Sequence, residues 1–260
     1  MSTDSKLKIN QLLSSHPSGI VYLSSWLVKQ GYSLDLQKRY RKSDWFTSIG
    51  TGAMGAMIRS GEDVGYEGAI YALQKQADLF IHPGGKTALA LLGKSHYLEL
   101  SQKRATLFGG KVERLPAWCV RYDWGIKLDY HSSSFLPPNI GLTEIELKTF
   151  SIKVSNAARA LMECLYLAPK KQTLLECYQL MEGLNNLRPD LVQNLLENCT
   201  SIKVKRLFLY MAEKTSHSWF QHIKTAAIDL GSGKRSIVQD GIYNGKYKIT
   251  VPKELENGEL

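Results

Sequence analysis

Residues 81–93 read IHPGGKTALALLG, and the Gly-Gly-Lys-Thr within them is the combination that ends a phosphate-binding loop. Such a loop needs the spacing G-x-x-x-x-G-K-[ST], whose backbone N–H groups surround the phosphates of a nucleotide. Five residues before Gly85 the chain has Phe80 instead of glycine, and Pro83 has no N–H to offer. We therefore interpret the stretch as a short strand, a glycine turn and the start of a helix, and expect no cofactor.

A second pattern could hold a divalent metal. Restriction-type nucleases place an Asp and a Glu on adjacent strands, with a lysine beside the attacking water. Glu146 and Lys148 have the E-x-K spacing, and Asp129 lies on an earlier predicted strand. The same spacing arises on a solvated strand face, where charged residues alternate with Ile145 and Leu147. We keep a nuclease core of Asp129, Glu146 and Lys148 as the alternative function.

The histidines and cysteines form no recognisable site. His217 and His222 are five residues apart, which puts them on different faces of a helix. The four cysteines are far apart and include no C-x-x-C pair, so they are expected to be reduced and mostly buried. We expect no metal site and no catalytic residue, and hence a protein that is not an enzyme.

The strongest functional pattern is a basic helix over residues 33–43. Leu36 and Tyr40 share one face and are expected to anchor the helix. Lysine and arginine on the other faces can bind phosphates and guanine edges, and glutamine can read adenine. A basic helix face that only contacts water has the same composition. The predicted DNA-binding residues are Ser33, Gln37, Lys38, Arg39, Arg41 and Lys42, with Thr51 and Arg59 from the hairpin that follows.

The elements around this helix form a known arrangement. Leu7 to Leu13 have helical spacing, IVYL is a short extended run, and SSWLVKQ is a helix that ends at Gly31. The basic helix begins after Ser33, and WFTSIG and AMGAMIR flank the glycines at 50–52 as a hairpin. Helix, strand, helix, turn, helix and hairpin in this order describe a winged helix-turn-helix domain.

The rest of the chain is mixed. A helix over 63–77 precedes the glycine turn, strands follow from about residue 97, and helices return after Ser155. The alternation in LTEIELKTFSIKVS shifts by one residue, which predicts a bulge or bend near 148–149. Asn244-Gly245 predicts a hairpin. The predicted fold class is α+β, with a winged helix domain over 1–60, a helical extension over 61–96 and a mixed α/β domain over 97–260.

Charge favours a polyanionic partner. The 260 residues hold 33 Lys and Arg against 24 Asp and Glu, a net charge of +9. A second basic stretch over 200–250 could extend a DNA-binding surface or receive an acidic partner, but a solvated surface is the favoured interpretation. No apolar run is long enough to span a bilayer and the N-terminus resembles no signal peptide, so we expect a cytoplasmic protein with no membrane partner.

Three segments together resemble the AbiEi antitoxins of type IV toxin–antitoxin systems. They are YLSSWLVKQGYSLDLQKRYRKSDWFTSIGTGAM, YEGAIYALQKQADLFIHPGGKTALALLG and LPAWCVRYDWG. The resemblance covers roughly residues 8–250 and is most specific in 66–93 and 114–124. It implies a winged helix that binds inverted repeats in its own promoter and represses the operon. It also implies a C-terminal domain that counters a toxin of the nucleotidyltransferase type.

Carried over by position, the DNA contacts fall on residues 33–43 and on the hairpin at 45–59. The hairpin here has few charges near its tip, where wings of the family often carry Arg or Lys. A protein whose winged helix is a scaffold with little DNA affinity therefore stays open as a third interpretation.

Overall fold

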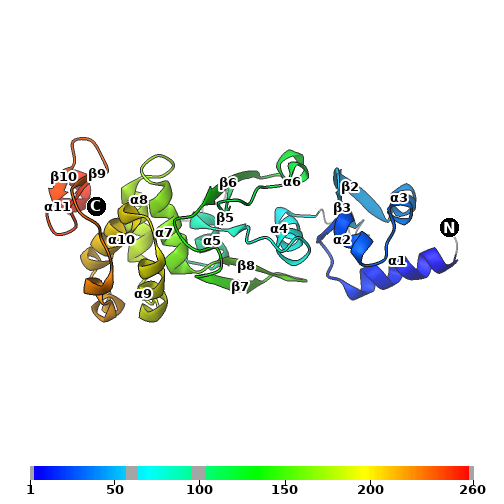
Figure 1. Cartoon of the computed structure of the whole chain (residues 1–260), viewed down its shortest axis with the longest axis horizontal. Coiled ribbons are helices and arrows are strands. Elements are labelled where there is room, and N and C mark those ends of the chain that lie inside the picture. The colour runs from blue at the N-terminus through cyan, green and yellow to red at the C-terminus, as the bar shows by residue number, and fades with distance from the viewer. Residues whose placement is uncertain (1–2, 57–63, 95–103, 258–260) are drawn as a thin grey trace. The chain divides into compact units, whose positions relative to one another are not determined.

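The computed structural model describes residues 3–56, 64–94 and 104–257 (Figure 1). The chain forms two compact units, each assembled from segments that are not contiguous. Unit 1 consists of Met1–His82, Gln102–Ser132 and Glu144–Lys153, and unit 2 of Pro83–Ser101, Ser133–Thr143 and Val154–Leu260. Helices and strands occur in both, which confirms the predicted α+β class.

Unit 1 begins with three helices and a small sheet. Helix α1 (Thr3–Ser15) precedes strand β1 (Val21–Leu23), after which come α2 (Ser24–Lys29), α3 (Leu34–Lys42) and a hairpin of β2 (Phe46–Gly50) and β3 (Ala53–Ala56). Strand β3 lies between β1 and β2 and pairs antiparallel with both. The order of these elements is the one predicted from the sequence, up to residue 56.

A single cluster of buried side chains joins these elements. Leu36 and Tyr40, the predicted anchors of the basic helix, are 9% and 0% exposed. The Tyr40 ring lies 5.9 Å from the Phe46 ring, which ties α3 to strand β2. Burying a side chain of this size stabilises a fold by about 1.5–3 kcal/mol. The cluster comprises Ile9, Leu12, Ile20, Tyr22, Leu27, Leu36, Tyr40, Phe46 and Met54.

Helix α4 (Tyr66–Lys75) is held against strand β1. The Gln76 side chain, just after the helix, accepts a hydrogen bond from the Leu23 N–H (2.8 Å) and donates one to the Val21 carbonyl (2.7 Å). A Cβ at Gly68 would lie 2.1 Å from the Gly19 carbonyl oxygen. Only glycine permits this approach of α4 to the preceding loop.

A second sheet has the order β4-β5-β6. Its strands are β4 (His82–Pro83), β5 (Arg104–Gly110) and β6 (Lys127–Ser133), and the short helix α6 (Ala117–Arg121) lies between β5 and β6 in the chain. Helix α6 packs on strand β2. A Cβ at Gly50 would lie 2.8 Å from the Trp118 Cβ, so the hairpin and α6 meet without an intervening side chain.

Strands β7 (Leu142–Glu146) and β8 (Ser151–Ser155) form a two-stranded sheet. Of the bulge or bend predicted near 148–149, the structure has the bend. The chain turns there, and the Leu147 N–H donates to the Phe150 carbonyl across the turn (2.8 Å). A reversal of the chain restarts the alternation of side chains on the new strand, which accounts for the shift of one residue.

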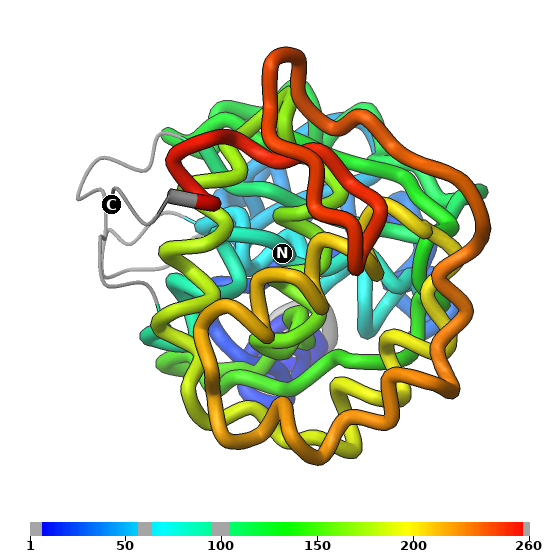
Figure 2. Tube along the Cα trace, turned by 90° about the vertical axis from the view of Figure 1, so that its left-hand side faces the viewer, coloured from blue at the N-terminus to red at the C-terminus, as the bar shows by residue number. Residues whose placement is uncertain are grey.

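Unit 2 is built around helix α7 (Ala157–Leu167), which packs on α5, α8, α9 and α10. These are α5 (Gly85–Leu91), α8 (Leu174–Glu182), α9 (Pro189–Asn198) and α10 (Ile202–Lys214). Short 3-10 turns follow at Ser218–His222 and Thr225–Ala227. The C-terminal segment holds β9 (Arg235–Ser236), β10 (Ile242–Asn244), β11 (Ile249–Val251) and α11 (Lys253–Asn257), drawn in orange and red (Figure 2).

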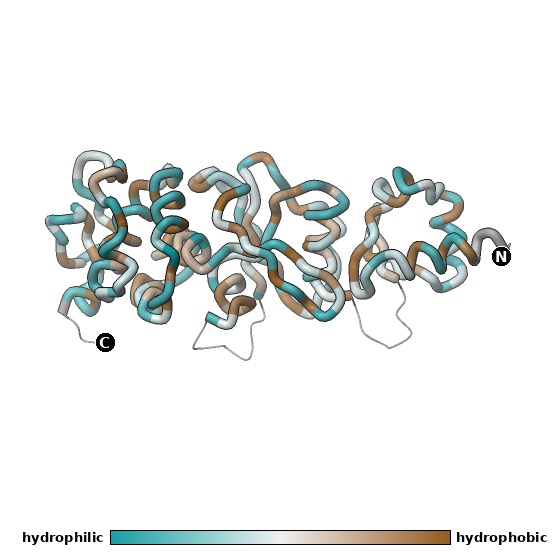
Figure 3. The backbone as a smooth tube through the Cα atoms, turned by 90° about the horizontal axis from the view of Figure 1, so that it is seen from below, coloured by the Kyte–Doolittle hydropathy of each residue, from teal (hydrophilic) through white to brown (hydrophobic). Residues whose placement is uncertain are grey.

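The hairpin predicted at Asn244-Gly245 is confirmed, because β10 and β11 pair antiparallel. Its loop spans 245–248, so it is longer than a two-residue turn. Figure 3 shows apolar and polar residues interleaved along the helices of this unit, as expected of helices with one buried face. Over the described residues, no helix has the length and apolar character needed to cross a membrane.

Candidate nucleic-acid interface

Helix α3 is positioned by its N-terminal cap and by one buried face. The Ser33 hydroxyl accepts a hydrogen bond from the Leu36 N–H (3.3 Å), which satisfies one of the free N–H groups of the first turn. Between α2 and α3 the chain passes through Gly31, whose φ of +86° suits glycine. Asp35 lies in the first turn and Arg39, Arg41 and Lys42 in the last, an order that complements the helix dipole.

The structure corrects the role expected of Gln37. Its side chain is 1% exposed, so it cannot reach the edge of a base. The Gln37 amide accepts a hydrogen bond from the Ser24 hydroxyl (2.6 Å) and donates to the carbonyls of Ser24 (3.2 Å) and Tyr32 (2.8 Å). Gln37 therefore fixes α3 to α2, and its burial follows from those partners.

The basic side chains of α3 lie on the surface. Lys38, Arg39, Arg41 and Lys42 are all exposed. Within the described ranges, none of the four forms a hydrogen bond or an ion pair with another side chain. Leu34 is 65% exposed and precedes Lys38 and Arg41 by four and seven residues, so these three share one stripe of the helix. The DNA-binding residues predicted from the sequence do not include Leu34, although its spacing of four residues from Lys38 places both on the same face of the helix.

Of the two hairpin residues predicted to contact DNA, the structure describes Thr51. Thr51 is exposed at the turn between β2 and β3. Next to it, Gly50 packs on Trp118, and the Gly52 carbonyl accepts a hydrogen bond from the Ser24 N–H (2.8 Å). Arg59 lies outside the described residues. The tip of the hairpin is thus fixed to its surroundings on one side and presents one polar side chain on the other.

The residues of the nuclease alternative are not arranged as that chemistry requires. Asp129 is on β6, in the sheet β4-β5-β6, whereas Glu146 ends β7, which pairs with β8 in a separate sheet. Lys148 is in the turn after β7 and not on a strand. The Asp129 carboxylate lies 3.4 Å from the His131 imidazole. No group of three potential metal ligands occurs in the described part of the chain.

The segment that resembles a phosphate-binding loop, residues 81–93, binds a carboxylate of the protein itself. At the start of α5 the Gly85 N–H donates to the Glu163 carboxylate (2.9 Å), and Glu163 is fully buried. The same carboxylate accepts from the Ser155 hydroxyl (2.8 Å) and from Arg159 Nε (2.9 Å). Lys86 forms an ion pair with Glu176 (2.7 Å). These contacts support the interpretation of residues 81–93 as a packing element.

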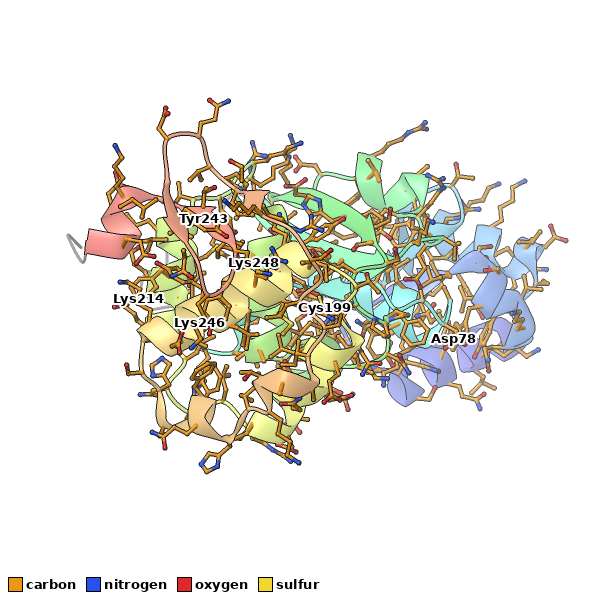
Figure 4. The ribbon with its side chains drawn as sticks, turned by 60° about the vertical axis from the view of Figure 1, so that its left-hand side comes forward. Asp78, Cys199, Lys214, Tyr243, Lys246 and Lys248 are labelled. Atoms are coloured by element: carbon orange, nitrogen blue, oxygen red, sulfur yellow. The ribbon has the colours of Figure 1, made fainter. Side chains whose placement is uncertain are left out.

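Part of the basic stretch over 200–250 is structural. Lys205 and Arg206 are buried, and their charged groups donate to backbone carbonyls of the loop after residue 228. The Lys203 ammonium donates to the carbonyls of Tyr166 and Ala168. Figure 4 shows Lys246, Lys248 and Tyr243 on the C-terminal segment; Lys246 pairs with Glu213. The prediction of a solvated surface is therefore wrong for Lys205 and Arg206. The sequence does not show that these two side chains are buried.

Two family models match this chain, over residues 5–100 and 102–252. Both describe the AbiEi antitoxin, a transcriptional regulator of type IV toxin–antitoxin systems, the first as its N-terminal domain. The chain belongs to the AbiEi family. Membership confirms the resemblance and makes the protein a member of a family of antitoxins that regulate transcription.

Comparison with solved structures adds the fold. The crystal structure of the RV2827C protein from Mycobacterium tuberculosis matches 100% of this chain and 95% of its own, with a TM-score of 0.62 and 12% identity. At that identity the likeness concerns the fold alone. No curated protein sequence matches the chain.

Proposed function

We propose that this AbiEi-family chain is a DNA-binding autorepressor. In this proposal α2 and α3 form a helix-turn-helix, β2 and β3 form the wing, and α3 enters the major groove of the promoter of its own operon. The observation that carries the proposal is a set of four exposed cations on a helix whose other face is fixed by Leu36, Gln37 and Tyr40. These cations form no side-chain hydrogen bond or ion pair with the residues that the structure describes. Cations that form no ion pair within the protein can bind phosphate without first breaking one.

The proposed DNA-facing side chains follow from this geometry. The stripe of Leu34, Lys38 and Arg41 faces the base edges, because Lys and Arg suit guanine and an apolar group suits the thymine methyl. The remaining polar groups bind the backbone and fix the register. The proposed phosphate contacts are Ser33, Arg39, Lys42 and Thr51, with Arg59 retained from the sequence prediction. Two copies on the half-sites of an inverted repeat would place their α3 helices about one helical turn apart.

The second half of the function concerns the toxin. We propose that residues 97–260 counter a toxin of the nucleotidyltransferase type and that the functional boundary lies near residue 97. The family models, which divide between residues 100 and 102, support this boundary. The protein is proposed to act without catalysis, in the cytoplasm, where an operon repressor meets its DNA. Growth rescue on co-expression with the neighbouring toxin gene tests neutralisation, and co-purification tests direct contact.

A gel-shift titration with the promoter DNA of the operon tests the repressor proposal. The K38E/R41E double variant is expected to lose the shift, since both contacts become repulsive. The K111E/K170E double variant is the control, because it changes the charge equally at two exposed lysines outside α3. The R39A/K42A variant removes two of the proposed phosphate contacts, so its slope of log K against log salt should be shallower by about 1.8, which is 0.9 for each lost contact.

The scaffold interpretation predicts that the same gel-shift titration shows little binding of the wild-type chain to promoter DNA. It is favoured by one observation, that the hairpin tip packs on α6 and presents no cation among residues 46–56. If the wild-type chain does not shift promoter DNA while it still rescues growth from the toxin, the scaffold interpretation holds. If K38E/R41E shifts the promoter as well as wild type does, α3 is not the recognition helix.

A further inference from the structure

Unit 1 contains a pocket that the proposed DNA surface does not use. It lies among the loop after β5, helix α6 and strand β6, and has a volume of about 610 Å³. This is within the range of pockets that hold small ligands. It is lined by Glu113, Arg114, Leu115, Val120, Tyr122, Trp124, Ile126, Lys127, Leu128, Tyr130 and Ser132.

Two aromatic rings form one wall of the pocket. The centroids of Tyr122 and Trp124 are 4.6 Å apart, and both side chains are half-buried, so part of each ring is open to the pocket. Trp124 is held in place because its indole N–H donates to the Cys119 carbonyl (2.8 Å) and its ring packs edge-to-face on Trp118, with 69° between the ring planes. A fixed, partly exposed aromatic pair is suited to stacking against another flat ring.

The free charges of the pocket are positive. Arg114 and Lys127 are exposed and have no carboxylate partner among the described residues. Burial raises the pKa of Tyr130 to about 12, the charge of Glu113 adds to the rise, and the charge of Arg114 opposes it. The one carboxylate in the lining, Glu113, accepts hydrogen bonds from the N–H groups of Phe80 and Gly110. These hydrogen bonds hold the carboxylate in the loop after β5.

We propose that this pocket binds a free nucleotide, with the base against Tyr122 and Trp124 and the phosphates held by Arg114 and Lys127. The ligand class follows from the combination of a stacking surface with two cations in a confined volume. A nucleic-acid strand needs a groove in which several stacking groups follow one another. Here the two rings lie in one pocket with two cations, which is enough for one base and its phosphates.

Isothermal titration calorimetry of the full chain with ATP, and separately with AMP, tests the proposal. Adenosine and inorganic pyrophosphate are titrated as the ring and the anion alone, and each is expected to bind at least ~10-fold more weakly than ATP. The R114A/K127A variant should weaken ATP binding ~10-fold or more, because each charge-assisted hydrogen bond is lost. R104A/K111A is the matched control, since it removes two exposed cations of unit 1 outside the pocket lining and should bind ATP as wild type does.

W124L tests the stacking wall, and the Y122L variant supports it should W124L fail to fold. Either is expected to weaken ATP and adenosine while leaving pyrophosphate unchanged. Absence of heat with all four ligands at about millimolar concentration, or equal affinity in R114A/K127A and wild type, overturns the proposal. A single-stranded oligonucleotide that binds far more tightly than ATP also overturns it, because the pocket would then be one part of a strand-binding surface. The promoter gel shift is independent of these titrations, so the two proposals can fail separately.

Discussion

Glu163 allows the packing at the start of α5 to be tested by one substitution. Its carboxylate is 0% exposed and accepts from the Gly85 N–H (2.9 Å), the Ser155 hydroxyl (2.8 Å) and Arg159 Nε (2.9 Å). Glu163→Gln preserves the shape but removes the charge and replaces one acceptor oxygen by an NH₂ group. With the remaining oxygen toward Arg159 and the NH₂ toward a rotated Ser155 hydroxyl, the Gly85 N–H is left without an acceptor.

The expected cost is about 3 kcal/mol. An unsatisfied buried N–H costs about 1–3 kcal/mol, and removing one partner of a buried ion pair costs about 3–5 kcal/mol. The lower end applies here because Arg159, 4% exposed, keeps its bonds to the carbonyls of Pro137 and Ile140. A loss of 3 kcal/mol changes the unfolding equilibrium constant by roughly 150-fold. Urea unfolding followed by tryptophan fluorescence measures it.

Glu176→Gln is the control, because it makes the same chemical change in an ion pair with Lys86 that is about 37–39% exposed. That change is expected to cost at most about 1 kcal/mol. The double variant R159M/E163L should be more stable than the sum of its single variants predicts, since it leaves neither charge unpaired. If Glu163→Gln unfolds within about 0.5 kcal/mol of wild type, the carboxylate does not hold α5 and the reasoning fails.

Three further outcomes can be measured on the same protein. Arg206→Met should cost about 2–4 kcal/mol, because its buried guanidinium donates to four backbone carbonyls; unchanged urea unfolding would contradict this. Burial raises the pKa of Cys119 and of Cys177 to about 12, so Ellman's reagent should react with the native chain far more slowly than with the unfolded one; equal rates would show that the thiols are accessible. Burial also raises the pKa of Glu67, so the native state holds its proton more strongly and its stability falls as the pH rises between the unfolded and folded pKa values. Glu67→Gln should therefore raise Tm more at neutral pH than below the unfolded pKa, and an equal change at both would refute the shift.

Local spacing predicted the anchors of the basic helix but not the fate of the residue between them. Leu36 and Tyr40 are four apart, and that periodicity alone places them on one face. Gln37 lies at the edge of that face, where spacing leaves burial open. Its burial depends on Ser24 and on the Tyr32 carbonyl, which only the packing of α2 against α3 brings within reach.

Long-range partners explain the other differences. Arg206 lies in a run of charges that suggests a wet surface, yet the carbonyls that hold it come from residues 230–248, far along the chain. The shift of alternation near residue 148 has two possible physical causes, a bulge and a bend, and the spacing alone predicts either one. Leu147 to Phe150 contain no Gly, Pro, Asn or Asp, so turn chemistry did not distinguish them. The nuclease hypothesis requires Asp129 and Glu146 on adjacent strands. The sequence predicts both strands, but which strands pair depends on the whole sheet.

The contact of Gly50 with Trp118 has a consequence for regulation. Helix α6 meets the hairpin at Trp118 and lines the pocket of unit 1 at Val120, two residues later. No side chain separates Gly50 from α6, so this helix touches both the hairpin and the pocket. If nucleotide binding in the proposed pocket displaced α6, it would also displace the hairpin. Thermodynamic linkage would then require that promoter DNA and nucleotide change the affinity for each other by the same factor. A repressor of this kind would respond to the nucleotide pool without a separate sensory domain.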